Sequence, residues 1–180
     1  MVATHDNLDH PTWLFFDLDP VAGVSFDWVL EVAGWIEERL EALGLLGLPK
    51  TSGGDGLHTF VPLVPSYTFE EVRAWLRAFI AALSRRYPGA ITSDKQLAAR
   101  HGRVLIDYAQ NVQGKSIVAP YSVRAKPHAP VSTPLRWVEV HVRQVRPTDF
   151  TLRTVPERVR QMGTPLARWD QHSQCNDALL

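Results

Sequence analysis

The first strong pattern along the chain is an apolar run that ends in two carboxylates. The run Trp13 to Phe16 predicts a buried strand that leads into Asp17-Leu18-Asp19-Pro20, where proline is expected to end it. From Phe26 to Leu43, apolar residues recur at spacings of three and four, which predicts an amphipathic helix. Ser25 is expected to cap this helix, and Gly44 to follow its end.

The middle of the chain predicts two short strands around a glycine-rich turn and then a second helix. The strands are expected over Leu48 to Thr51 and Leu57 to Leu63, with Ser52-Gly53-Gly54-Asp55-Gly56 between them. The spacing of Thr68 and Glu71 is that of a capping box, which marks the start of the helix. We expect this helix to end at Pro88-Gly89.

The pattern becomes less regular in the second half. A short helical piece is predicted near Lys95 to Arg100, and a strand over Arg103 to Tyr108. Gly114 to Pro134 is rich in proline and predicted to be irregular, and a last short helix is predicted to be capped by Thr154 and to end at Gly163. This order predicts an α/β (α+β) fold, in which a mixed, largely antiparallel sheet is backed by helices.

Composition indicates how many domains the chain forms and in which compartment it is expected. The 180 residues are 45% hydrophobic and 21% charged, which fits one domain over residues 1–165 with a polar tail over residues 166–180. The sequence contains no apolar run long enough to cross a membrane and no signal segment, so a cytoplasmic protein is expected. The single Cys175 excludes an intrachain disulfide and a cysteine-rich zinc site.

The net charge of zero hides an asymmetry between the two halves. Residues 1–94 contain 6 Lys and Arg against 13 Asp and Glu, whereas residues 95–160 contain 12 against 4. An acidic half followed by a basic half suits a protein that holds cations next to phosphates. Two differently charged, solvated faces are the alternative interpretation.

Three aspartates are the first candidates for chemistry. Asp17 and Asp19 are two residues apart on a predicted strand, so their side chains are expected on the same face. Asp107 follows the apolar run Val104-Leu105-Ile106 and can bring a third carboxylate from a neighbouring strand. Such a set can bind two hard divalent cations, as in phosphoryl transfer. The alternative is that Asp17 and Asp19 only cap a turn at Pro20.

The glycine-rich turn is the second candidate. Gly53 and Gly54 allow the backbone to approach a ligand closely, and consecutive N–H groups in such a turn can bind an anion. Ser52 adds a hydroxyl, and His58 at the start of the next strand can donate to a phosphate oxygen. A simple hairpin has the same pattern, and the sequence lacks the Gly-Lys-Ser/Thr of a P-loop.

A third group consists of polar residues around Asp107. Arg100 and Arg124 can neutralise a triphosphate through paired hydrogen bonds, and Gln110 lies three residues past Asp107. Each of them, taken alone, also fits a solvated surface position.

Several short segments along most of the chain, taken together, resemble the polymerase domain of bacterial ligase D, within the archaeo-eukaryotic primase superfamily. The matching segments are Leu8-Asp9-His10-Pro11, Phe16-Asp17-Leu18-Asp19-Pro20, Lys50-Thr51-Ser52-Gly53-Gly54 with Gly56-Leu57-His58, Ile106-Asp107-Tyr108 with Gln110-Asn111, Val118-Ala119-Pro120-Tyr121-Ser122 with Arg124-Ala125, Pro130-Val131-Ser132-Thr133-Pro134-Leu135, and Asp149-Phe150-Thr151-Leu152-Arg153. Because they occur in the family order, their combination is more specific than any single motif.

The resemblance implies a nucleotidyltransferase that adds nucleotides to DNA 3′ ends or fills short gaps during non-homologous end joining. It implies that Asp17, Asp19 and Asp107 hold two divalent cations, manganese or magnesium. The implied contacts to the incoming nucleoside triphosphate are Ser52, His58, Arg100, Gln110 and Arg124. The implied partners are DNA ends, the end-binding protein Ku and a DNA ligase, and the implied location is the nucleoid.

Two departures from the family pattern matter. Asp55 stands where the family turn usually has lysine, and its charge is expected to weaken nucleotide binding unless a cation compensates. The family domain also has a longer N-terminal portion before the segment that matches Leu8, so we expect a truncated catalytic core, or one completed by a separate N-terminal polypeptide. Two alternatives remain open at this point: a catalytically weak or inactive protein that binds nucleotide or DNA ends, and a phosphatase of the haloacid dehalogenase type with Asp17 as nucleophile.

Overall fold

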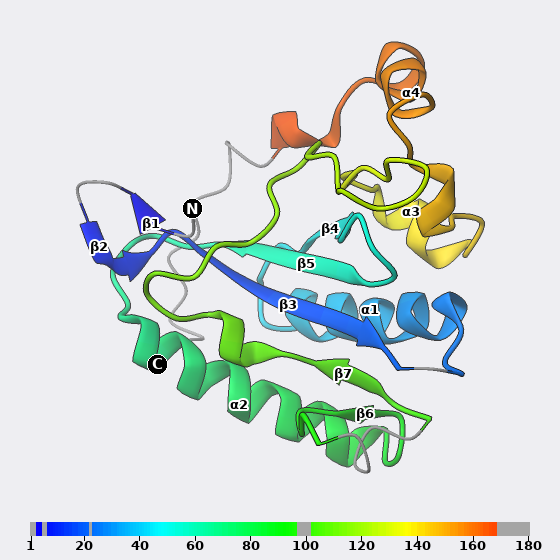
Figure 1. Ribbon diagram of the computed structural model, residues 1–180. Coiled ribbons are helices and arrows are strands. Elements are labelled where there is room, and N and C mark those ends of the chain that lie inside the picture. Colours follow the sequence, from blue (N-terminus) through cyan, green and yellow to red (C-terminus); the bar gives the residue numbers. More distant parts are fainter. Residues whose placement is uncertain (1–2, 5–6, 22, 97–101, 169–180) are drawn as a thin grey trace.

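The computed structural model describes residues 3–4, 7–21, 23–96 and 102–168 (Figure 1). Its main sheet is built from β3 (Trp13–Pro20), β4 (Leu48–Thr51), β5 (Leu57–Pro62), β6 (Ile91–Thr92) and β7 (Val104–Ile106). The strand order is β4-β5-β3-β7-β6, with antiparallel pairing throughout except between β6 and β7, which are parallel. The predicted mixed, largely antiparallel sheet is confirmed.

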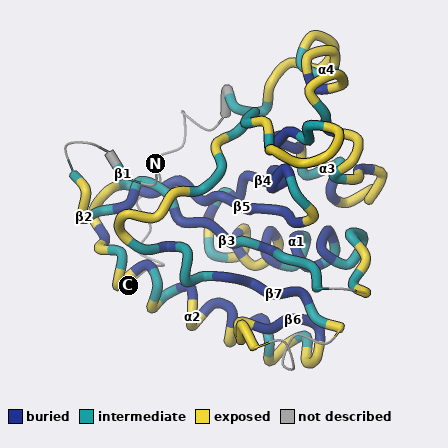
Figure 2. Tube along the Cα trace, in the orientation of Figure 1, coloured by how far each residue is buried: buried dark blue, intermediate teal, exposed yellow. Residues whose placement is uncertain are grey.

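One face of this sheet is covered by two helices, α1 (Phe26–Glu41) and α2 (Phe69–Arg86). Because side chains alternate along a strand, Leu14, Phe16 and Leu18 of β3 share this face, and all three belong to the main hydrophobic core. The Phe16 ring lies 5.0 Å from the ring of Phe79 in α2. β5 is buried along its whole length, whereas β3 is buried mainly in its first half and less so toward its end (Figure 2).

The two helices begin where the capping patterns predicted. The Ser25 hydroxyl accepts a hydrogen bond from the Trp28 N–H at 3.3 Å, and the capping box between Thr68 and Glu71 is formed. Helix α1 ends at Glu41, slightly earlier than expected. Both helices are therefore determined by local sequence signals that agree with the burial of their apolar faces.

The opposite face of the sheet carries a smaller apolar cluster. Phe15, Leu48 and Phe60 form its buried part, and Ile117 and Leu166 pack against it from later in the chain. The irregular segment from residue 112 to residue 135 crosses this face and pairs with the β4 edge, where the Thr51 N–H donates to the Thr133 carbonyl at 2.9 Å. This covering segment buries β4 and β5 on both faces.

The remaining elements are short. They are β1 (Ala3–Thr4), β2 (Asn7–Pro11), η2 (Tyr108–Gln110), α3 (Trp137–His141), η3 (Pro147–Asp149), α4 (Val155–Met162) and η4 (Pro165–Arg168). The β1–β2 hairpin, β6 and α3 were not predicted. Within the described ranges, no helix combines the length and the apolar composition needed to cross a membrane.

Several predicted details need correction or stay untested. Lys95 and Gln96 are not helical, and the rest of the helical piece predicted near Lys95 to Arg100 lies outside the described residues. The Thr154 hydroxyl makes no capping bond to α4 but donates to the Asp149 carbonyl at 2.6 Å. The predicted boundary between residues 165 and 166 falls inside η4, and residues 169–180 lie outside the described residues, so this boundary stays a prediction.

Candidate active site

A row of ionisable side chains crosses the face of the sheet that lies opposite the helices. Asp17 of β3 is paired with His58 of β5, which is paired in turn with Lys50 of β4. On the other side of β3, the Asp107 N–H donates to the Asp17 carbonyl at 2.9 Å. Directly opposed residues of antiparallel strands share a face. Lys50, His58, Asp17 and Asp107 therefore form what we call the charged row.

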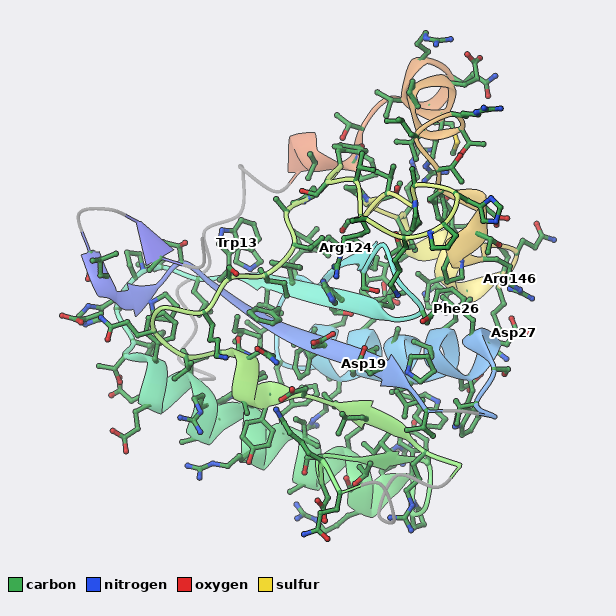
Figure 3. The ribbon with its side chains drawn as sticks, viewed as in Figure 1. Trp13, Asp19, Phe26, Asp27, Arg124 and Arg146 are labelled. Carbon is green, nitrogen blue, oxygen red and sulfur yellow. The ribbon has the colours of Figure 1, made fainter. Side chains whose placement is uncertain are left out.

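Asp19 lies on the same face as Asp17, two residues further along β3, and the glycine-rich turn comes close to it. A Cβ atom on Gly56 would lie 2.5 Å from the Leu18 carbonyl oxygen and 3.0 Å from the Asp19 Oδ1. Any residue larger than glycine would clash with the β3 backbone there. Figure 3 labels Asp19 on β3. Gly56 therefore lets the turn lie directly against the second carboxylate.

Arg124 comes from the covering segment and lies beside the same turn (Figure 3). Its Nη1 donates to the Ser52 carbonyl at 3.3 Å. Gly53 has a φ of +72°, and a Cβ atom there would lie 2.7 Å from the Arg124 Cγ. A second cation, the Nζ of Lys126, would lie 3.0 Å from a Cβ atom on Gly54. The turn is thus flanked by positive charge.

The Ser52 hydroxyl holds the turn together through hydrogen bonds to its backbone. Its oxygen accepts hydrogen bonds from the N–H groups of Gly54 at 3.1 Å and Gly56 at 3.2 Å. These two N–H groups are therefore already used within the turn. The hydroxyl proton of Ser52 is the group of this residue that can be donated to an anion.

His58 is buried and bonded through one of its two ring nitrogens. Its Nε2 lies 3.1 Å from the Asp17 Oδ1, while its Nδ1 is buried and has no hydrogen-bond partner among the described residues. Burial lowers the pKa of His58, and the bond to Asp17 opposes this effect. A buried polar atom without a partner is costly, so the Nδ1 favours a polar ligand at this position.

Lys50 is part of the charged row although sequence reasoning did not select it. It is 0% exposed, and its Nζ donates to the Ser132 hydroxyl at 2.5 Å and lies 5.5 Å from the centre of the Phe60 ring. Burial lowers the pKa of Lys50 to about 7. The signal that could have found it is strand alternation, because Lys50 shares a face with Leu48 in a strand that is otherwise apolar or hydroxylic.

Asp107 follows the last residue of β7, and its side chain is 8% exposed. The Lys95 Nζ lies 2.6 Å from its Oδ2, which also accepts a hydrogen bond from the Gln110 Nε2 at 3.2 Å. Its Oδ1 accepts from the Ala109 N–H at 3.0 Å. Both carboxylate oxygens are therefore bonded to groups of the same chain, and Lys95 is a further site residue that sequence reasoning did not select.

Most of the residues predicted for the site lie on this face or at its edge. They are Asp17, Asp19, Ser52, Gly53, Gly54, His58, Asp107, Gln110 and Arg124. Arg100 lies outside the described residues, so its predicted role stays a prediction.

The predicted metal ligands fit divalent cations by position and by chemistry. Asp17 and Asp107 are direct neighbours across two strands, Asp19 is on the same face, and carboxylate oxygens are the ligands that magnesium and manganese prefer. In the described part of the chain, no three His, Cys, Asp or Glu side chains are yet gathered closely enough to hold a metal ion. Asp17 is instead turned to His58, and Asp107 to Lys95 and Gln110.

The fold as a whole is that of a primase-polymerase domain. It matches the polymerase domain of Mycobacterium tuberculosis ligase D, determined in complex with DNA, with a TM-score of 0.84 and 32% sequence identity. The match covers 92% of this chain and 57% of the other. This confirms the fold class that the sequence predicted.

Sequence comparisons define the family. The chain is 31% identical over 156 residues to the bifunctional non-homologous end joining protein LigD of Bacillus subtilis, and 34% identical over 161 residues to the multifunctional LigD of Pseudomonas aeruginosa. These matches cover 86% and 89% of this chain but only 25% and 19% of the relatives. The family model described as LigD, primase-polymerase domain, matches residues 1–166. The chain therefore belongs to the LigD primase-polymerase domain family, as its sequence motifs predicted.

Proposed function

We propose that this chain is a nucleotidyltransferase that adds nucleotides to DNA 3′ ends or fills short gaps in non-homologous end joining. One observation carries the proposal beyond family membership. Asp17, Asp19 and Asp107 share one face of the sheet directly beside a glycine-rich turn that is flanked by Arg124. Acidic groups next to a turn that is flanked by cations suit a reaction between a hydroxyl and a metal-bound triphosphate.

The proposed roles follow the geometry of the face. Ser52 donates its hydroxyl proton to the triphosphate beside Gly53 and Gly54, and Arg124 offsets its charge from the other side of the turn. Once Asp17 turns toward a cation, the His58 ring proton can move from Nε2 to Nδ1, which has no partner in the described residues, and His58 can then donate to a phosphate oxygen. Gln110, and Arg100 by family resemblance, complete the proposed nucleotide contacts.

The proposed metal ligands are Asp17, Asp19 and Asp107. Two divalent cations, manganese or magnesium, would stabilise the attacking and leaving oxygens in the in-line displacement at the α-phosphate. To bind them, the Asp17 carboxylate must turn from His58 and the Lys95 ammonium must leave Asp107, while the strands keep the spacing of the carboxylates.

The proposed substrates are gapped or primed DNA ends and a ribo- or deoxyribonucleoside triphosphate. The relatives are named as non-homologous end joining proteins, and the matching structure contains DNA. The end-binding protein Ku and a DNA ligase are the proposed partners in that process.

The proposal is tested by manganese-supported nucleotide addition to a gapped duplex by this chain. We expect Asp17→Ala and Asp107→Ala to abolish extension while the circular dichroism spectrum stays unchanged. Glu70→Ala, which removes an exposed carboxylate in the first turn of α2, should extend like the wild type. Extension at the wild-type rate by either site variant would refute the catalytic assignment.

The alternative of a catalytically weak or inactive binding protein makes a different prediction. Such a protein would bind the triphosphate or the DNA end but extend no primer with either metal. The phosphatase alternative is not carried further, because the chain belongs to a different family.

A further inference from the structure

The contact between Lys95 and Asp107 is the feature of this face that the proposed chemistry does not explain. Lys95 follows β6 by three residues, and its side chain is 50% exposed, whereas that of Asp107 is 8% exposed. The distance of 2.6 Å between the Nζ and the Oδ2 is that of a charge-assisted hydrogen bond. A half-exposed surface cation thus reaches inward to a buried carboxylate.

Lysine is suited to a contact that has to be released. Its ammonium is a single strongly hydrated charge on a flexible stem, unlike the two-pronged guanidinium of arginine. Half of the Lys95 side chain remains in contact with water, so the ammonium can return to solvent at little cost. The bond between Asp107 and the Gln110 amide does not depend on Lys95 and can keep the carboxylate in place.

An ammonium group and a divalent cation at the same carboxylate oxygen compete for its negative charge. An ammonium that remained within hydrogen-bond distance of Oδ2 would repel any cation bound there. The pairing of Asp107 with Lys95, and of Asp17 with His58, also accounts for the absence of a gathered acidic cluster in the described residues.

We infer that Lys95 is a positioning residue that occupies Asp107 in the ligand-free protein and competes with the divalent cation for it. The inference rests on the proposed role of Asp107 as a metal ligand. Lys95 neutralises the buried carboxylate until a cation arrives, and it lowers the affinity of the site for that cation.

The test is titration with manganese in the absence of nucleotide and DNA, with free manganese measured by electron paramagnetic resonance. We expect Lys95→Met to lower the dissociation constant about two- to fivefold, the range that an exposed ion pair provides. Lys95→Arg retains a cation that can bind the carboxylate through two hydrogen bonds, and it should bind manganese no more tightly than the wild type. Lys115→Met, which removes an exposed lysine from the covering segment, is the matched control.

The outcomes separate this inference from the proposed function. If Asp107→Ala weakens manganese binding but Lys95→Met leaves it unchanged or weaker, the competition is refuted and the metal site stands. If Asp107→Ala has no effect on binding in either the wild-type or the Lys95→Met background, the metal role of Asp107 fails, and the inference fails with it.

Discussion

At the scale of single residues, Lys50 is a buried basic group next to the proposed active site. An ammonium group that is 0% exposed loses most of its hydration, and this loss lowers the pKa of Lys50 from 10.5 to about 7. The negative charge of Asp17 opposes this lowering only in part, and the Nζ also contacts the Ser132 hydroxyl and the Phe60 ring. The buried Lys50 ammonium therefore lowers the stability of the folded chain, at the β4 end of the charged row, whenever Lys50 is protonated.

This cost predicts a pH dependence of stability. Between about pH 7 and pH 10.5 the unfolded chain holds a proton on Lys50 that the folded chain has released, so the free energy of unfolding rises with pH. The free energy of unfolding rises by about 1.4 kcal/mol for each unit by which the pKa of Lys50 differs between the unfolded and the folded chain. Urea denaturation of the wild type and Lys50→Met from pH 6.5 to pH 10 should show the rise only in the wild type. An identical pH profile for the two would mean that Lys50 is not titrating in this range, and Lys115→Met controls for the loss of a lysine.

Asp55 is the second residue with a testable charge effect. Its side chain is 88% exposed at the tip of the turn, with its Oδ2 3.6 Å from the Lys126 Nζ. Asp55→Lys removes negative charge beside the proposed triphosphate, and we expect about threefold or greater tightening of nucleotide binding at low salt. Isothermal titration calorimetry measures the dissociation constant of the nucleotide, and Glu70→Lys, a charge reversal in α2, is the control. An unchanged dissociation constant would place the tip of the turn away from the triphosphate.

Residue types and their spacing identified the carboxylates and the turn but not their neighbours. Asp17 and Asp19 were recognisable because two acids on one face of a buried strand need a reason to be there. Lys50 and Lys95 were missed, because their roles depend on contacts with Ser132 and Asp107, which are distant along the chain. Strand alternation could have marked Lys50 as a residue of a buried face, but no local pattern encodes these contacts.

At the scale of elements, the turn between β4 and β5 is the least tolerant part of the site. A side chain on Gly56 would lie 2.5 Å from the Leu18 carbonyl oxygen, so Gly56→Ala must push β3 and the turn apart. We expect a loss of about 1–3 kcal/mol in the free energy of unfolding. Gly34→Ala in α1 is the control, because its Cβ atom would lie 3.8 Å from the His141 Nδ1 and alanine favours the helix. Equal stability of the two variants in urea denaturation would contradict the tight approach.

The elements that the sequence predicted are those with strong local signals. Both long helices have capping residues and apolar periodicity, and β4 was predicted with its observed bounds of Leu48 to Thr51. The missed elements are short. For example, β6 consists of Ile91 and Thr92, and only its parallel pairing with β7 defines it as a strand.

At the scale of the whole molecule, the charge asymmetry partly serves to join the two halves of the chain. Arg143 pairs with Glu31, and the Arg146 Nη1 lies 3.0 Å from the Asp27 Oδ1, so basic residues of the second half bind acidic residues of α1. Figure 3 labels Arg146 and Asp27 near the start of α1. Part of the asymmetry is therefore used in contacts within the protein, a role that neither interpretation of the charge count had considered.

The cations around the turn are those expected to meet DNA or nucleotide. Binding to a gapped duplex should weaken as salt rises, because phosphate contacts release counterions. We expect Lys126→Met to reduce the slope of log affinity against log salt by about one unit. The Arg160 guanidinium pairs with Glu157 in α4, so Arg160→Met should leave the slope unchanged. Fluorescence anisotropy over a range of salt measures both slopes, and equal slopes would exclude Lys126 from the DNA contact.

The most direct test of the account is a crystal structure of the chain with manganese and a non-hydrolysable nucleoside triphosphate. The account predicts anomalous manganese density in contact with the carboxylates of Asp17, Asp19 and Asp107, with the triphosphate against Ser52 and Gly53. Manganese and triphosphate bound elsewhere, with these three carboxylates in contact with neither, would contradict it.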